Sequence, residues 1–310
     1  MLRTMGRAIV SLGFCSVDHL CVVPHVPIDE KVELVERRTQ GGGPAATAAV
    51  AAARLGAQSA FCGAVGDDSS GADILAEFGR ERVDVRGVVA RPGAESAVSF
   101  CWAEQGTGRR SIVWSRGTAK PLTPDELDKE LLANAALLHL DGHQGQAALA
   151  AAAIVKAAGG QVSLDAGTLR PDMVELAKRC DIVIASERYA QAFLGADDPE
   201  RAVRAIHAQG PRIAAVTLGN RGWVGFDGGT LIRGEAFKVP VIDTTGAGDV
   251  FHGAFCVAWL ETADLERSLV FASAVSAMKC RQLGGRAGIP TRRELDEFLR
   301  VTPRPACVRA

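Results

Sequence analysis

A glycine-rich turn that leads into a helix-like stretch constrains this chain more than any other feature. The turn is Asp243-Thr-Thr-Gly-Ala-Gly-Asp249, and the apolar segment Val250–Leu260 follows it directly. Glycines permit backbone shapes that a Cβ would forbid. The first turn of a helix presents free N–H groups and the positive end of the helix dipole. Together these features suit an anion with several oxygens, such as a phosphoryl group.

A carboxylate inside an anion site would repel a bound phosphate, so the presence of Asp249 there requires a chemical explanation. A base that takes the proton from a neutral hydroxyl beside the phosphate provides that explanation, and this is the chemistry of phosphoryl transfer. The alternative is a carboxylate that only caps the helix. The preceding Gly246, Ala247 and Gly248, together with a second glycine pair at residues 42–43, favour catalysis.

The rest of the chain predicts an α/β fold, because short apolar segments alternate with helical ones. This order implies a mostly parallel sheet with helices on both faces. The predicted strands lie at residues 8–13, 59–63, 137–140, 161–165, 181–185 and 212–217. The predicted helices lie at 45–55, 71–81, 144–158, 250–260, 264–280 and 291–299, with further helical stretches between 185 and 212.

Four other segments mix apolar with charged residues, as strands do when one of their faces lies in water. They lie at residues 19–23, 32–38, 96–104 and 110–115. Because they occur in two separate stretches, we predict a small sheet that forms a lid from roughly residues 14–40 and 96–117. No linker or repeat divides the chain, so we expect a single domain over residues 1–310.

Charge and composition restrict the partners. The 35 basic and 36 acidic residues give a net charge of -1, which argues against a nucleic-acid surface. The alanine-rich tracts 44–53 and 145–158 are too short or too interrupted to span a membrane. The eight scattered cysteines contain no C-x-x-C pair, which predicts reduced thiols. We therefore expect a soluble, cytoplasmic protein.

Polar residues recur at the predicted carboxyl ends of strands, where ligands of parallel sheets gather. They are Asp18, Asp141, Asp165, Ser186, Thr217 and Asp243. Thr217 and Gly219 are placed to touch a phosphate, although an ordinary β-turn has the same composition. His252, one turn beyond Asp249, is either a partner of that carboxylate or an ordinary buried histidine. Arg109, Arg110 and Arg116 near the lid are candidates for reading an anionic substrate group.

A second glycine run, Gly41-Gly-Gly-Pro-Ala-Ala-Thr47, opens another predicted helix. Gly42 and Gly43 leave room for a small polar ligand against the backbone, whereas a plain turn with proline at the first helical position fits as well. A dinucleotide loop is a third alternative, since the glycine spacing matches loosely. The charged segment at 32–38 does not suit the buried first strand of that fold.

The two glycine segments together resemble the signatures of the ribokinase-like (PfkB) carbohydrate kinases. Residues 42–57 resemble the N-terminal signature, and residues 243–254 match the C-terminal one closely. The resemblance covers nearly the whole chain. It implies a three-layer ribokinase-like fold with a β-sheet lid that often mediates dimers. It also implies ATP-dependent phosphorylation of a primary hydroxyl of a sugar, with Mg²⁺ as cofactor.

The resemblance assigns roles to matching residues. Asp249 is the base, and Gly246, Ala247 and Gly248 form the anion hole. The predicted sugar-binding residues are Asp18, Gly42, Gly43, Thr47 and Asp141. The predicted nucleotide-binding residues are Ser186, Thr217, Gly219, Gly222 and Thr244, with Gly246 and Gly248. Asp243 and Thr245, with carbonyls of the 280s loop, resemble the site that holds a monovalent cation such as K⁺ in several members.

The chain also departs from the family pattern. Thr47 stands where many members have a sugar-binding asparagine. The N-x-x-E motif, which organises magnesium through water, would fall on Ser186-Glu-Arg-Tyr189, and neither end matches. Within the family the motifs resemble those of sulfofructose kinases most. Yet the positions expected to read a sulfonate, near Trp114 and Gly142, carry no basic side chain.

The sequence therefore predicts an ATP-dependent kinase of a ketose, a sulfosugar or a related carbohydrate, acting as a homodimer through the lid. One alternative is a nucleoside kinase on the same scaffold, because Phe100, Trp102 and Trp114 lie near the lid of an otherwise aromatic-poor chain. Another is a catalytically silent sugar sensor, which the intact turn at 246–249 disfavours.

Overall fold

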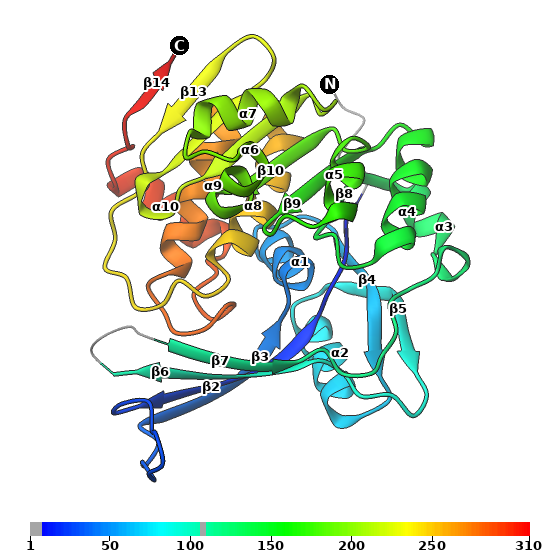
Figure 1. Cartoon of the computed structure of the whole chain (residues 1–310), viewed down its shortest axis with the longest axis vertical. Helices are drawn as coiled ribbons and strands as arrows, with labels where there is room; N and C mark the ends of the chain where they lie inside the picture. Colours follow the sequence, from blue (N-terminus) through cyan, green and yellow to red (C-terminus); the bar gives the residue numbers. More distant parts are fainter. Residues whose placement is uncertain (1–7, 106–109) are drawn as a thin grey trace.

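A ten-stranded sheet and a separate four-stranded sheet form the framework of the computed structural model, which describes residues 8–105 and 110–310 (Figure 1). The large sheet has the order β14-β13-β12-β11-β10-β9-β8-β1-β4-β5. Its strands from β11 to β5 run parallel, and β12, β13 and β14 are added antiparallel at one edge. The predicted α/β fold with a mostly parallel sheet is confirmed.

The strands of the large sheet include all six that the sequence predicts. They are β1 (Ala8–Leu12), β4 (Ser59–Gly66), β5 (Asp84–Arg91), β8 (Ala135–Leu140), β9 (Gln161–Ala166), β10 (Ile182–Ser186), β11 (Ile213–Thr217), β12 (Trp223–Phe226), β13 (Leu231–Gly234) and β14 (Cys307–Arg309). The central strands are apolar runs buried on both faces, as in β8. Sequence analysis missed β5 and the three antiparallel strands, whose runs are short or mixed with charge.

Helices cover both faces of this sheet and enclose two apolar cores. On one face lie α1 (Pro44–Arg54), α2 (Ser69–Arg80), α8 (Ala247–Thr262), α9 (Leu265–Lys279) and α10 (Arg292–Val301). On the other lie α3 (Lys129–Ala133), α4 (Gly145–Ala157), α5 (Pro171–Ala177), α6 (Glu187–Leu194) and α7 (Pro199–His207). Two short 3₁₀ turns, Pro124–Glu126 and Gly219–Arg221, complete the elements. Within the described residues, no helix has the length and apolar character needed to cross a bilayer.

The small sheet projects from this body and is called the lid below, after its predicted role (Figure 1). It contains β3 (Glu36–Gly42), β2 (Ser16–Val23), β6 (Val98–Glu104) and β7 (Arg110–Ser115), in that spatial order. The strand predicted at 32–38 is misplaced: it begins at Glu36 and continues through the glycines, which pair with Val17 and Ser16 of β2. The pairing partner, which the local pattern does not reveal, fixes this register. Arg109 lies outside the described residues.

Candidate active site

Helix α8 begins at the glycine turn, as predicted. Its N-cap, Gly246, has a φ of 72°, in the left-handed region that favours glycine. A Cβ at this position would also lie 2.9 Å from the Cα of Gly285 on the facing loop. Gly248, by contrast, faces open space. The turn is therefore packed on its loop side and open on the side where the first N–H groups of the helix can meet an anion.

Asp249 lies in the first turn of α8 with a partly exposed side chain. Its pKa is raised from 3.8 to about 7, first by burial and next by the negative charge of Asp165. Asp141 and Asp18 act in the same direction, and His252 opposes them. A carboxylate with a pKa near neutrality accepts a proton more readily than an ordinary aspartate does. The geometry thus favours a base over a simple helix cap.

His252 is the partner of Asp165 rather than of Asp249. Its Nε2 lies 3.2 Å from Oδ1 of Asp165 at the end of β9, and both side chains are buried. Burial would raise the pKa of Asp165, but the charge and hydrogen bond of His252 outweigh it and hold that pKa below its usual value. Asp165 was recognised only as a strand-end residue, and its contact with α8 is a tertiary feature.

Asp141, at the end of β8, ties three segments together. Its Oδ2 accepts hydrogen bonds from the backbone N–H of Phe14 (2.8 Å) and Ala45 (3.2 Å), and its Oδ1 accepts one from the N–H of His143 (2.9 Å). Burial raises its pKa in spite of these bonds. A Cβ on Gly13 would overlap the carboxylate. Asp141 therefore fixes the start of α1 against the ends of β1 and β8.

Asp18 and the two predicted sugar-binding glycines lie together where the lid joins the body. Oδ1 of Asp18 accepts hydrogen bonds from Ser16 (2.9 Å) and Ser99 (2.7 Å). A Cβ on Gly42 would lie 2.1 Å from Oδ2 of Asp18, so any larger residue there would displace this carboxylate. Gly43 caps α1 with a φ of 92° and leaves no room for a Cβ against the chain before it. These contacts hold Asp18 at the base of the lid.

Thr47 is buried beneath this loop, and its hydroxyl accepts a hydrogen bond from Nε of Arg286 (3.3 Å). Arg286 is 2% exposed and also donates to the carbonyl of Gly42 (3.0 Å) and to Glu77 (2.9 Å). The hydroxyl predicted to contact the sugar is thus bonded to an arginine. Sequence analysis missed Arg286, although an arginine inside the glycine-rich stretch 284–288 was a usable signal.

A cavity of about 220 Å³ lies beside the anion turn, between the Gly219–Arg221 turn and helices α8 and α9. The predicted nucleotide-binding residues Thr217, Gly219, Gly222 and Thr244 line it together with Ala247 and Gly248. The rest of its lining, which the sequence did not indicate, is mostly apolar: Asn220, Trp223, Ala236, Phe237, Val239, Val241, Phe251, Ser273, Ser276, Ala277 and Cys280. An apolar cleft beside an anion site suits a flat base followed by phosphates.

Ser186 does not line this cavity. It caps α6, with its hydroxyl accepting from the N–H of Tyr189 (3.0 Å) and donating to the carbonyl of Gly167 (2.7 Å). The neighbouring Glu187 forms an ion pair with Arg221. The residues at the N-x-x-E positions therefore do not fit the role of organising magnesium. Across residues 8–105 and 110–310, no group of three or more His, Cys, Asp or Glu is arranged as a metal site.

Asp243 connects the anion turn to the 280s loop. Its Oδ1 accepts hydrogen bonds from the N–H (2.9 Å) and hydroxyl (2.8 Å) of Thr245, and its Oδ2 accepts one from the N–H of Gly284 (2.8 Å). Burial would raise its pKa, but these bonds lower it below the usual value. The carbonyl of Asp243 accepts from Nζ of Lys279 (2.9 Å), and Arg110 of the lid lies 3.3 Å from its carboxylate.

Two arginines lie near the predicted sugar end. Arg116 follows β7 and lies over the rings of Phe14 and Trp114, with its Cζ 5.5 and 5.7 Å from the ring centroids. Arg170 donates to the carbonyl of Gly142 (2.9 Å). Positions 114 and 142 themselves carry no basic side chain, but the fold brings a guanidinium beside each of them.

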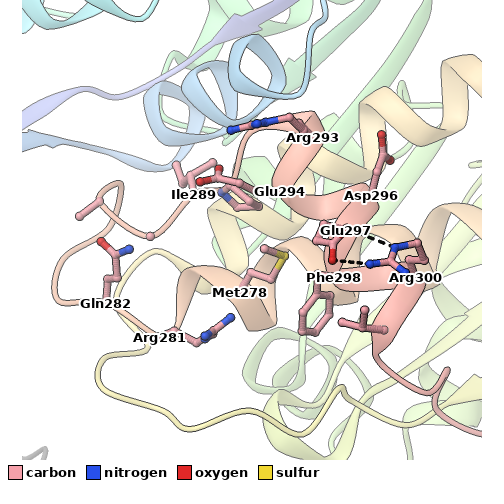
Figure 2. Close-up of a pocket in the computed structure, with 14 residues that line it drawn as sticks. Met278, Arg281, Gln282, Ile289, Arg293, Glu294, Asp296, Glu297, Phe298 and Arg300 are labelled. Atoms are coloured by element: carbon pink, nitrogen blue, oxygen red, sulfur yellow. Dashed lines mark hydrogen bonds and ion pairs between the residues drawn. The ribbon is translucent and has the colours of Figure 1, made fainter.

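A larger cavity, of about 980 Å³, lies between the end of α9, the 280s loop and α10 (Figure 2). Its walls carry apolar side chains such as Met278 and Phe298 and exposed charges, including the Arg300–Glu297 ion pair. None of the predicted site residues lines it. Size alone does not mark the site, because the titratable groups with shifted pKa values gather elsewhere.

Comparison with known proteins agrees with this geometry. The model of the pfkB family of carbohydrate kinases matches residues 7–292. The chain is 30% identical to the ribokinase of Haemophilus influenzae over 95% of this chain and 99% of that protein. It is 29% identical to the ATP-dependent ribose-1-phosphate kinase of Halopiger xanaduensis, over 94% and 97%. The structure of Arabidopsis thaliana ribokinase complexed with ribose and ATP has a TM-score of 0.85 and 26% identity, covering 96% and 100%.

Proposed function

The chain belongs to the pfkB family of carbohydrate kinases, and on that premise we propose that it transfers the γ-phosphate of ATP to a primary hydroxyl of a sugar with Asp249 as the base. The observation that carries this proposal is the position of Asp249. Its pKa is about 7, and it lies in the first turn of α8, next to the cavity lined by Gly248 and Thr217.

In the proposed reaction, Asp249 takes the proton of the sugar hydroxyl while the hydroxyl oxygen attacks the γ-phosphorus. A P–O bond to the sugar forms, the bond to the β-phosphate oxygen breaks, and ADP leaves. The N–H groups of residues 246–248 stabilise the charge on the transferring group. Magnesium enters as part of the ATP substrate and shields phosphate charge. The free thiols of the eight cysteines support a cytoplasmic location.

The sugar is proposed to lie between the body and the face of the lid that carries Asp18. The carboxylate of Asp18, held by Ser16 and Ser99, is placed to accept hydrogen bonds from sugar hydroxyls. Trp114 meets Phe14 edge to face, with centroids 6.3 Å apart, and offers an apolar wall.

We further infer that the acceptor carries an anionic group at the end near Gly142. Burial lowers the pKa of His143 and the negative charge of Asp141 opposes this shift, whereas the positive charges of Arg170 and Arg116 add to it, so both guanidinium groups lie near this point. Two guanidinium groups at this end suit a carboxylate, phosphate or sulfonate, and Arg170 is held there by Asp172 at 3.7 Å. The ribose-1-phosphate kinase similar to this chain also acts on an anionic sugar. This inference keeps sulfosugars among the candidates.

A coupled assay of ADP release tests both levels of the proposal. Ribose, fructose, gluconate, fructose 6-phosphate and 6-deoxy-6-sulfofructose would be compared with adenosine. Turnover of sugars is expected, with the anionic ones preferred. Strong turnover of adenosine would favour the nucleoside kinase, and ligand-induced thermal shifts without ADP release would favour the silent sensor.

The role of Asp249 is tested by Asp249→Asn. Loss of positioned base catalysis should lower kcat by about 10²–10⁴-fold and leave ATP binding largely intact. Glu130→Gln is the matched control, since Glu130 is also a carboxylate in the first turn of a helix but lies exposed on α3. Full activity of Asp249→Asn would reject the role.

A further inference from the structure

The oxygens expected to hold a monovalent cation are already bonded to protonated groups. Both carboxylate oxygens of Asp243 accept hydrogen bonds, from Thr245 and from the N–H of Gly284. The carbonyl of Cys280, in the same loop, accepts the N–H groups of Ile242 (2.8 Å) and Asp243 (3.2 Å). A bound cation needs oxygen lone pairs that point toward it. This donor-rich arrangement therefore does not fit K⁺.

The carbonyl of Asp243 is bonded to a positively charged side chain instead of a metal ion. It accepts a hydrogen bond from the ammonium of Lys279, at 2.9 Å. Lys279 is the last residue of α9, and its side chain is 0% exposed. Lysines are rarely buried so completely unless they are paired. The sequence analysis assigned this lysine no function.

The hydrogen bond to the carbonyl of Asp243 places the ammonium of Lys279 at the start of the anion turn. Burial lowers the pKa of Lys279, and Arg110 adds to this shift, whereas the negative charges of Asp243 and Asp249 oppose it and favour the ammonium. Asp243 and Asp249 are the two ends of the anion turn, and α9 packs along α8. A lysine ammonium is a compact charge of +1, the same charge that K⁺ would bring.

We propose that Lys279 is a built-in monovalent cation, whose ammonium takes the place of K⁺ at Asp243 and adds positive charge behind the anion hole at residues 246–248. The chain then needs no K⁺. The catalytic half of this inference rests on the proposed kinase function, whereas the structural half concerns only what binds at Asp243.

The first test needs no variant. The activity and the melting temperature of the wild-type protein would be measured in KCl, NaCl and choline chloride at equal ionic strength. Lys279 as the resident cation predicts rates within about twofold of one another and no specific rise of the melting temperature in KCl. Activation by K⁺ of about tenfold or more would overturn the proposal, because removal of one group at an oxyanion site has effects of that size or larger.

The second test removes the ammonium of Lys279 and leaves space in its place. Lys279→Ala should lose at least about tenfold of the wild-type kcat in choline chloride, and K⁺ or NH₄⁺ should restore much of it and raise the melting temperature of this variant. Lys279→Met is the matched control, since its side chain fills the space without a charge and should not respond to either ion. If Lys279→Ala ignores K⁺ and NH₄⁺ in both measurements, the proposal is wrong.

These readouts separate this inference from the proposed function. The melting temperatures report cation binding even if no sugar is ever phosphorylated. If sugars are phosphorylated and the wild-type protein requires K⁺, the kinase assignment stands and the role of Lys279 falls. If Lys279→Ala does not fold, the wild-type measurements in the three salts still decide.

Discussion

At the level of single residues, the chemistry depends on how differently the fold treats two neighbouring aspartates. Burial and the charge of Asp165 raise the pKa of Asp249, whereas the charge and hydrogen bond of His252 hold the pKa of Asp165 below its usual value in spite of burial. Asp165 therefore stays a carboxylate, and its charge strengthens Asp249 as a base. Environments that give two neighbouring titratable groups very different pKa values are typical of acid–base sites.

Replacement of Asp165 should change the pH dependence of activity. With Asp249 as the base, the rate should fall as the pH drops through about 7, where this carboxylate takes up a proton. Asp165→Asn removes a negative charge, so the pKa of Asp249 falls and the acid limb of kcat/KM should move to lower pH by on the order of one unit. The pH profile between 5 and 9 checks this. A uniform loss of rate with an unmoved limb would indicate a purely structural role.

The raised pKa of Asp249 should also cost stability at neutral pH. In the unfolded chain this group ionises near 3.8, whereas in the folded protein it keeps its proton up to about 7. Folded stability therefore falls as pH rises between these values and then levels off. Asp249→Asn avoids this loss, so it should be more stable than the wild-type protein by on the order of 2–4 kcal/mol at pH 8 and by less at pH 5. Thermal unfolding at both pH values, without ligands, checks the trend, and an equal difference at both would contradict it.

The residues that sequence analysis identified are those whose role follows from local position. Asp141 follows a predicted strand and Asp249 follows a glycine turn, whereas Asp18, also predicted at the carboxyl end of a strand, lies near the start of β2. The roles of Arg286 and Lys279 depend instead on the path of the 280s loop across the site. The glycine-rich stretch 284–288 marks Arg286 as a candidate, but no local pattern encodes that path or the contacts that it brings about.

At the level of elements, the site depends on two turns that come from distant parts of the chain and pack on each other. The turn before α8 meets the 280s loop at Gly246 and Gly285. The same loop reaches the start of α1 through Arg286, which is bonded to the carbonyl of Gly42. Both helices were predicted because glycine and proline mark their starts locally. Strands β12 and β13 were missed because their antiparallel pairing continues a sheet predicted as parallel.

Gly246→Ala should disable the anion hole while the protein still folds. Alanine at a φ of 72° costs roughly 1–2 kcal/mol, and its Cβ would also press on Gly285. We expect kcat to fall at least about tenfold. Gly195→Ala is the matched control, since Gly195 has the same φ of 72° with nothing near its Cβ position. Comparable stability losses with unequal kcat would support this account, and an unchanged kcat in Gly246→Ala would contradict it.

At the level of the whole molecule, the two faces of the lid carry different side chains. Asp18, Ser99 and Trp114 are neighbours across β2, β6 and β7, and they face the body. Phe100 and Val113 form the next pair along β6 and β7. Because side chains alternate along a strand, they lie on the opposite face, away from the site. The mixed segments predicted a small sheet, but only the strand register shows which of its faces carries Asp18 and Trp114.

The outer face of the lid is where we expect a second copy of the chain to bind. Phe100 is 44% and Val113 is 59% exposed, and β7 is an edge strand whose six residues are all exposed. Apolar edge strands pair with other chains unless they are covered or charged. Wild-type protein should therefore sediment as a dimer, and Val113→Glu should shift it toward monomer because a buried charge opposes association. Val308→Glu, on exposed strand β14 at the far edge of the large sheet, is the control and should remain dimeric. A wild-type monomer, or a dimer that survives Val113→Glu, would exclude this surface as the interface.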